Sequence, residues 1–159
     1  RELEELVEFL EKTTGKTLDR EKLRDRIRIS LSANNDMIKI HRLRMEKPCP
    51  LRARDAFNSF GMRIAGEGLP DSAEFFRAQL KEVEGRVARG EGVLKEERFR
   101  LTANGAYPFF AMELIDWMQE EYGAIIVADM FNSTPWRPIE DDIETTDPIA
   151  LLAKKWLYF

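Results

Sequence analysis

The sequence contains one cysteine, Cys49, and one histidine, His41, among its 159 residues. A single cysteine excludes an internal disulfide bond, and one cysteine with one histidine is too few for a protein-only zinc site of the usual type. An all-cysteine iron–sulfur site needs more thiolates than this chain has. Because such sparse cysteine is typical of a reducing compartment, we expect a cytoplasmic protein and assign no metal ligand to this chain.

Long hydrophobic runs and known phosphate-binding motifs are also absent. No apolar run approaches the roughly 20 residues that span a bilayer, so we expect no membrane partner. The chain has neither a G-x-G-x-x-G fingerprint nor a Walker Gly-Lys-Ser/Thr, and it has no G-x-S-x-G elbow. With 43% hydrophobic and 34% charged residues, its composition is that of a globular protein.

Positive charge is concentrated in residues 20–47, which hold nine Lys or Arg against four Asp or Glu. This segment has a net charge of +5 and the rest of the chain −9, which together give the overall −4. Such a segment either meets phosphates or forms a solvated helix face. We favour the helix face and expect no nucleic acid partner, because no aromatic residues alternate with the charges to stack on bases.

The first 96 residues are predicted to be mostly helical. One helix ends at Gly15, and a long second helix runs from an N-cap at Asp19 to about Glu46. Two apolar stripes on the long helix predict that it is covered on two sides. They comprise Leu23, Ile27, Leu31, Ile38 and Met45, and Ile29, Ala33, Met37 and Ile40. After a break at residues 48–50, a short helix is expected near 54–64. A further helix, opened by a capping box of Asp71 and Glu74, is expected to reach about Arg89.

Residues 97–159 are predicted to begin an α/β domain in the order strand, helix, strand, loop, helix. The alternating residues 98–103 and the apolar residues 124–128 predict two parallel strands. The helix between them is expected to start at Pro108, with Phe109, Met112, Ile115 and Met118 facing inward. A last helix is expected to begin at Asp147-Pro148, with Leu151, Leu152 and Trp156 inward. The predicted fold class is therefore α/β, a helical half followed by a partial parallel sheet.

Ligands of open parallel sheets gather at the carboxyl ends of the strands, which here are residues 103–107 and 129–134. Asn104-Gly105 is either a ligand-binding turn that leads to a helix N-terminus or a plain connection. Asp129 either binds a ribose hydroxyl, acts as a base, or caps a loop. His41 lies on an apolar helix stripe, where a lone histidine is more often a packed residue than a ligand or base.

The order of segments resembles the 2-hydroxyacyl-CoA dehydratase D-component family. ELEELVEFLEKTTG at residues 2–15, followed by KTL, is similar to the family's "fLE…TG…l" pattern, and Leu23 with Asn34 or Asn35 takes its later places. Residues 98–102, 122–130 and 147–153 resemble a strand, the next strand and a following helix start of its second α/β domain. Ala103-Asn104 departs from the glycine that many members have at this turn.

The resemblance implies flavodoxin-like, three-layer α/β domains and a [4Fe-4S] cluster held by cysteines. It implies one-electron chemistry on an acyl-CoA thioester in a subunit of a 2-hydroxyacyl-CoA dehydratase or benzoyl-CoA reductase. The implied partners are the acyl-CoA, a homologous second subunit and an ATP-dependent iron–sulfur activator. Family subunits are more than twice as long, so we expect a cluster-free internal fragment, a helical connector (1–96) and the start of a domain (97–159), inactive by itself.

Within that family, the turn 102–107 and the loop 129–134 would face the cluster and the acyl-CoA. Asn104 and the nearby N–H groups are then expected to stabilise charge on the thioester carbonyl, and Asp129 to do acid–base work. The expected substrate-binding residues are Thr102, Gly105, Ala106, Tyr107, Met130 and Asn132. Two alternatives stay open. One is a noncatalytic interaction module built on helices 19–46 and 71–89, and the other is a small nucleotide-binding enzyme, which the missing glycine fingerprint disfavours.

Overall fold

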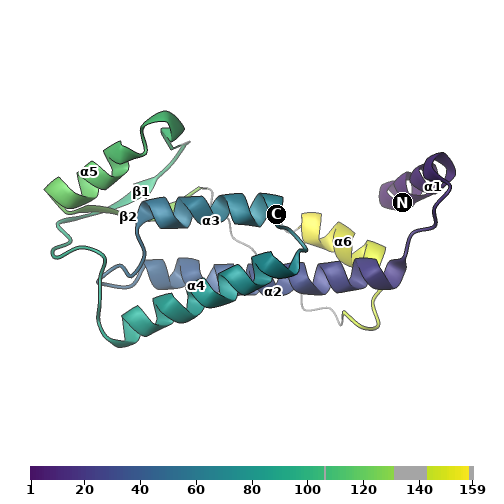
Figure 1. Cartoon of the computed structure of the whole chain (residues 1–159), viewed down its shortest axis with the longest axis horizontal. Helices are drawn as coiled ribbons and strands as arrows, with labels where there is room; N and C mark the ends of the chain where they lie inside the picture. Colours follow the sequence, from purple (N-terminus) through teal and green to yellow (C-terminus); the bar gives the residue numbers. More distant parts are fainter. Residues whose placement is uncertain (106, 131–142, 158–159) are drawn as a thin grey trace.

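The computed structural model describes residues 1–105, 107–130 and 143–157 and shows an elongated molecule (Figure 1). The helix α2 runs along most of its length, with the strands and α5 at one end and α1 and α6 at the other. The elements follow one another as α1 (Glu2–Thr14), α2 (Arg20–Arg44), α3 (Ala53–Ala65), α4 (Pro70–Ala88), β1 (Phe99–Ala103), the 3-10 helix η1 (Phe109–Ala111), α5 (Glu113–Tyr122), β2 (Ala124–Asp129) and α6 (Pro148–Leu157).

Helix α2 is the central helix of the molecule and is covered on two sides, as its two apolar stripes predict. Its N-cap is Asp19, whose carboxylate accepts a hydrogen bond from the backbone N–H of Lys22 at 2.9 Å. One stripe packs against α4 and the other against α6. Met45 is an exception to the prediction, because the helix ends at Arg44 and leaves the Met45 side chain 56% exposed.

The predicted helix ends are confirmed in most places. Gly15 ends α1 with a φ of 66°, the left-handed conformation expected of a C-terminal glycine. The predicted capping box at Asp71 and Glu74 is wrong, because α4 begins one residue earlier, at Pro70, with no side-chain cap. Proline is preorganised for the first helical position, and Asp71 then lies inside the first turn, where its charge favours the helix dipole.

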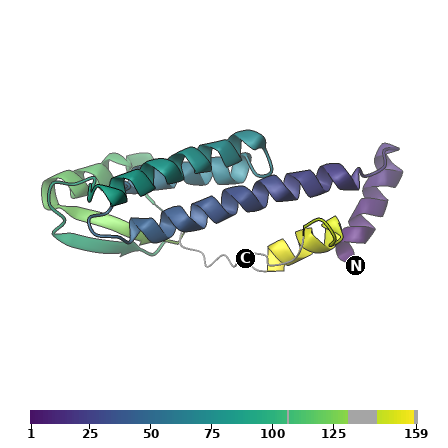
Figure 2. The ribbon, with the colours of Figure 1, turned by 90° about the horizontal axis from the view of Figure 1, so that it is seen from below.

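Strands β1 and β2 form a parallel pair joined by α5, so the predicted strand–helix–strand unit and the α/β class are confirmed. Phe99 pairs with Ala124 at one end and Ala103 with Asp129 at the other, with an irregularity between Leu101 and Thr102. Figure 2 shows both strands at the end of α2 that lies far from α1. The carboxyl ends of the strands therefore meet, as the sequence predicts.

Two further residues that were predicted to face inward, besides Met45, are exposed. Phe109 is 60% exposed because Pro108 leads into the 3-10 helix η1 rather than into an α-helix, and the different residue period shifts the face it presents. Its ring contacts Phe57, with 5.1 Å between ring centroids. Trp156 is also 60% exposed, because the helical period places Lys155 below Leu151 on the buried face of α6.

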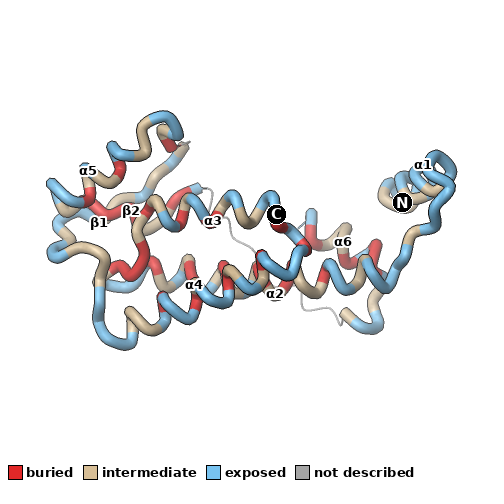
Figure 3. The backbone as a smooth tube through the Cα atoms, in the orientation of Figure 1, coloured by how far each residue is buried: buried red, intermediate tan, exposed pale blue. Residues whose placement is uncertain are grey.

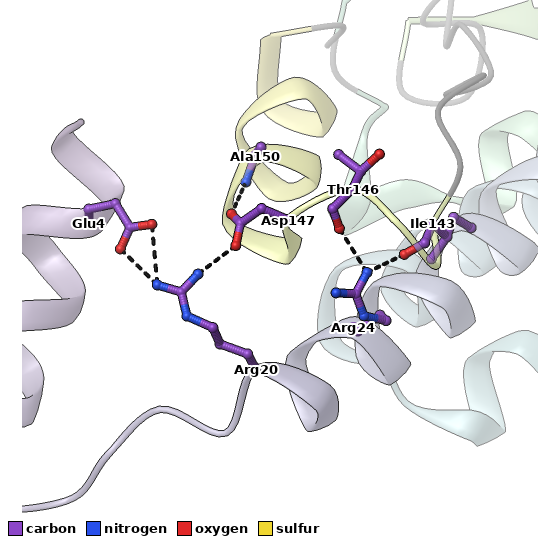
Figure 4. A network of polar contacts seen from close by, with 7 residues as sticks. All are labelled: Glu4, Arg20, Arg24, Ile143, Thr146, Asp147 and Ala150. Carbon is purple, nitrogen blue, oxygen red and sulfur yellow. Dashed lines mark hydrogen bonds and ion pairs between the residues drawn. The ribbon is translucent and has the colours of Figure 1, made fainter.

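Buried residues follow the helix interfaces and the strands, whereas α1 has none (Figure 3). At the α1 end, Arg20 joins Glu4 and Asp147, and Arg24 donates to the carbonyls of Ile143 and Thr146 (Figure 4). Asp147 also caps α6, accepting from the N–H of Ala150 at 3.0 Å, as predicted. Helix α6 thus packs on α2.

A division of the chain into two domains between residues 96 and 97 stays a prediction. In the described parts of the chain, no helix is both long and apolar enough to cross a membrane.

Candidate functional site

The carboxyl ends of β1 and β2 bring most of the described candidate residues together. We call this region the carboxyl edge, and it comprises residues 102–105, 107 and 129–130. The register aligns Thr102 with Ala128 and Ala103 with Asp129, so the turn after β1 lies beside the end of β2. Ala106 and Asn132 fall outside the described residues.

The turn at Asn104-Gly105 leaves its backbone accessible. Gly105 has a φ of +124°, a conformation that side chains disfavour, so glycine is needed here for its backbone freedom. A Cβ built at this position would meet no atom of the described residues within 4 Å, apart from its chain neighbours. Thr102 and Asn104 are exposed. The turn therefore offers the polar groups of Thr102 and Asn104 to a ligand.

Tyr107 follows this turn, two residues after Gly105, and is only 4% exposed. Its ring contacts that of Phe57 on α3, with 5.0 Å between the centroids, and packs in a cluster with Ile115 and Ile126. Burial raises the pKa of Tyr107, and the nearby Asp129 carboxylate raises it further. The hydroxyl therefore keeps its proton at neutral pH and acts there as a hydrogen-bond donor.

Asp129 ends β2 and forms a fully buried ion pair with Arg44. Arg44 Nη1 lies 2.9 Å from Asp129 Oδ2, and both side chains are 0% exposed. Arg44 Nη2 donates to the carbonyl oxygen of Ile126, also at 2.9 Å. A buried carboxylate is tolerated only when it is paired, so Arg44 makes the position of Asp129 possible.

His41 lies one turn before Arg44 on α2, and neither of its ring nitrogens has a hydrogen-bond partner among the described residues. Burial lowers the pKa of His41 to about 3, and the positive charge of Arg44 lowers it in the same direction, while Asp129 opposes them. The imidazole is therefore neutral at physiological pH. This environment agrees with the packed role that the sequence favours for His41.

The sequence did not single out Arg44, although Asp129, Tyr107 and Thr102 were all expected at this edge. Arg44 lies four residues after Ile40, a member of one of the two predicted apolar stripes. That spacing places both residues on one face of α2, and both are buried. The sequence signal that could have identified Arg44 was therefore a charged residue in phase with a buried apolar stripe. Met130, another expected residue, is 51% exposed.

Most arginines of the basic segment are paired with acids or carbonyls. The paired acids include Glu4 and Asp147 with Arg20, and Asp25 and Glu144 with Arg28. Arg26 donates to the carbonyl of Gly68. These contacts favour the helix-face interpretation of the basic segment over a phosphate site.

The described residues do not fit an iron–sulfur cluster. Cys49 lies beside the amino end of β1, since its backbone N–H donates to Glu97, two residues before that strand. Its thiol is buried and donates to the carbonyl of Leu51, with 3.3 Å between sulfur and oxygen, and burial raises its pKa. No cluster of three or more His, Cys, Asp or Glu suited to a metal occurs in the part of the chain that the structure describes.

Comparison with known proteins identifies the relatives of this chain. All of residues 1–159 match the family described as 2-hydroxyglutaryl-CoA dehydratase, D-component. A subunit of the benzoyl-CoA reductase of Thauera aromatica is 26% identical over 141 residues, which are 80% of this chain and 32% of that protein.

A second relative is the (R)-phenyllactyl-CoA dehydratase alpha subunit of Clostridium sporogenes. It is 24% identical over 133 residues, which are 82% of this chain and 32% of that protein. The chain therefore spans about a third of the length of the curated relatives that it matches.

Proposed function

Because the chain belongs to the 2-hydroxyglutaryl-CoA dehydratase, D-component family, we propose that it is part of an iron–sulfur subunit acting on acyl-CoA thioesters by one-electron chemistry. The names of its relatives are those of one reductase and one dehydratase of acyl-CoA compounds. We place the reaction in the same class, dehydration of a 2-hydroxyacyl-CoA or reduction of an aromatic acyl-CoA.

The carboxyl edge is the surface that we assign to the thioester. The observation that supports this most is the turn at Gly105, which follows β1 beside the end of β2. Two buried residues flank it, Tyr107 in the chain that follows and Asp129 at the end of β2, where Arg44 pairs with it. The Asn104 amide and the Gly105 backbone N–H are donors suited to a carbonyl oxygen that gains negative charge. Donors of this kind lower the free energy of such a charged state because they are already oriented. Thr102, Ala106, Tyr107, Met130 and Asn132 are assigned to substrate binding.

Asp129 is the proposed acid–base residue of the edge. Its side chain is buried, so proton exchange with substrate would pass through a neighbouring polar group, and the Tyr107 hydroxyl is a suitable neighbour. The raised pKa of Tyr107 keeps that hydroxyl a donor at neutral pH. Asn104 and Asp129 thus take different roles, with Asn104 stabilising charge and Asp129 exchanging a proton.

The cluster and the partner proteins belong to the same proposal. A [4Fe-4S] cluster takes several thiolates, and Cys49 is buried at the opposite end of the strands from the carboxyl edge. Cysteines outside these 159 residues would therefore hold it. A homologous second subunit and an ATP-dependent activator complete the proposed assembly.

The test uses the intact protein in which these residues occur, produced without oxygen together with its second subunit. Iron, acid-labile sulfide and the EPR spectrum of the reduced protein are measured, along with turnover of benzoyl-CoA and (R)-phenyllactyl-CoA. We expect a cubane cluster, and a loss of about 100-fold in kcat for Asn104→Ala. Asn35→Ala, on the exposed face of α2, is the matched control and is expected to retain activity. A folded intact protein without iron would contradict the proposal.

A noncatalytic interaction module is the second candidate, and one observation favours it. Helices α1 and α6 enclose an open groove of about 1000 Å³, lined partly by Leu3, Ile149 and Trp156. Leu6 and Phe9 of α1 are also exposed, at 49% and 62%. If this groove were the functional surface, Asn104→Ala would leave both partner binding and any activity unchanged, and a substitution on α1 would abolish binding.

A further inference from the structure

We propose that Arg44 is a positioning residue of the carboxyl edge, which fixes Asp129 and Tyr107 in the arrangement that receives an acyl-CoA thioester. The inference rests on the proposed function of that edge. It adds a residue from the helical half of the chain, at a position that the sequence pattern does not mark as part of a site.

The contacts of Arg44 join two elements that are distant in sequence. Its backbone belongs to the last turn of α2, and its guanidinium bonds both the side chain of Asp129 and the carbonyl of Ile126, each at 2.9 Å. Those two acceptors lie at the end of β2 and three residues before it. A planar guanidinium with two donors in use fixes the direction of the strand end, and not only its distance from α2.

From Asp129 the effect extends to the other strand and the turn. Asp129 pairs in register with Ala103, the residue before Asn104. The Asp129 carboxylate also raises the pKa of the nearby Tyr107 hydroxyl. A displacement of Asp129 would therefore alter the surroundings of both Ala103 and Tyr107, which lie on either side of the Asn104-Gly105 turn. Effects of about 100-fold are typical when a reacting group is misplaced by about 1 Å.

Lysine is the informative replacement for Arg44. An ammonium keeps the positive charge that Asp129 needs, yet it is a compact point charge and does not reproduce the planar, two-acceptor geometry. Arg44→Lys thus separates the geometry of the clamp from its charge.

Arg24 supplies the matched control, because it is an arginine of the same helix with a side chain only 12% exposed. It donates to two carbonyls, those of Ile143 and Thr146, at the α6 end of the molecule (Figure 4). Arg24→Lys therefore makes the same chemical change to a similar clamp, away from the carboxyl edge.

The experiment measures the melting temperature and the Kd for benzoyl-CoA by calorimetry, with free coenzyme A as a second ligand, on the intact protein. We expect both lysine variants to lower the melting temperature modestly. We expect only Arg44→Lys to weaken benzoyl-CoA binding, by about tenfold or more. If Arg44→Lys bound benzoyl-CoA as tightly as Arg24→Lys does, this result would overturn the role of Arg44 and leave the proposed function in place. A wild-type protein that binds no acyl-CoA, with (R)-phenyllactyl-CoA also tried, would overturn both.

A double variant keeps the test decisive if Arg44→Lys fails to fold. Arg44→Met with Asp129→Leu removes both buried charges together, and such replacements are commonly neutral for stability. We expect this variant to melt near the wild-type temperature and still to bind benzoyl-CoA about tenfold or more weakly. Wild-type affinity in the folded double variant would show that the ion pair is only structural and would overturn the proposal.

Discussion

Helix α2 makes an arginine–aspartate ion pair near each of its ends, and the two pairs differ in burial rather than in geometry. Arg20 lies 2.6 Å from Asp147, and their side chains are 45% and 46% exposed. Arg44 lies 2.9 Å from Asp129, and both side chains are fully buried. The exposed pair is the shorter one, yet water competes for both of its partners. Burial, and not the distance between the charges, therefore decides how much stability is lost when one of these pairs is broken.

The difference also separates the roles of the two ends. At the α1 end, α1 has no buried residue, and Arg20 of α2 forms an ion pair with Glu4 of α1. At the strand end, both side chains of the Arg44–Asp129 pair are fully buried, and Arg44 also bonds the carbonyl of Ile126, a residue of a buried core cluster. Breaking the exposed pair releases two groups into water, whereas breaking the buried pair leaves an uncompensated charge in the interior.

The largest effect should come from Arg44→Met alone. This substitution leaves Asp129 buried without its partner, and we expect a loss of about 3–5 kcal/mol in the free energy of unfolding. Urea unfolding of the variant measures it. The double variant Arg44→Met with Asp129→Leu should recover most of the loss. Little change in the single variant would mean that water reaches Asp129 and that the two ends of α2 are alike.

Acidification should act mainly at the strand end, through His41. Its pKa is about 3 in the folded protein and 6.5 in an unfolded chain, so the unfolded state binds a proton first as the pH falls. The contribution of His41 to the free energy of unfolding is therefore fully present above pH 6.5 and decreases as the pH falls toward 3. Between pH 7 and pH 5 this group should account for a loss of about 2 kcal/mol.

Urea unfolding at several pH values measures this dependence in the wild type and in His41→Leu. The leucine variant should lack the His41 contribution to the pH dependence. Above pH 5 most carboxylates are still ionised. If the free energy of unfolding depended on pH there equally in the wild type and in His41→Leu, this would contradict a buried neutral imidazole.

Gly105→Ala should show that the turn is selected for its backbone. Alanine is disfavoured at a φ of +124°, and we expect a loss of about 1–2 kcal/mol in the free energy of unfolding, although no atom of the described residues lies within 4 Å of the added methyl group. Gly61→Ala is the matched control, because Gly61 lies inside α3 with equally open space around its Cβ. That variant should be more stable than wild type by about 0.5–1 kcal/mol. Changes of the same sign at both positions would contradict a conformational requirement at Gly105.

The smallest effect is expected for Arg20→Gln at the exposed pair. Asp147 keeps its capping bond to Ala150 in this variant, so the change removes only solvated charge contacts. The melting temperature should fall slightly at low ionic strength, and the difference from wild type should vanish in about 1 M salt, where charges are screened beyond ~3 Å. A large loss that salt does not reduce would place Arg20 in the same class as Arg44.

The local elements were predictable because each has short-range causes. Gly15 and Asp19 mark a helix end and a helix start by their own backbone and side-chain preferences, and both act there as predicted. The two stripes on α2 predicted its two-sided burial. The prediction failed at Phe109 because this residue lies in a 3-10 helix, which has a different residue period. It failed at Trp156 because the helical period places Lys155 on the buried face of α6 instead.

By itself the sequence determined the strand–helix–strand order and hence the edge at which Thr102, Asn104 and Asp129 would meet, since parallel strands joined by a crossover must end on the same side. It also predicted a turn at Asn104-Gly105, and glycine there has the positive φ that a turn can require. Only the tertiary structure decided that Asp129 would be paired with Arg44 and His41 held neutral. Those properties depend on which groups are removed from water together, and residues separated by 85 positions are brought into such contact only by the packing of α2 against β2.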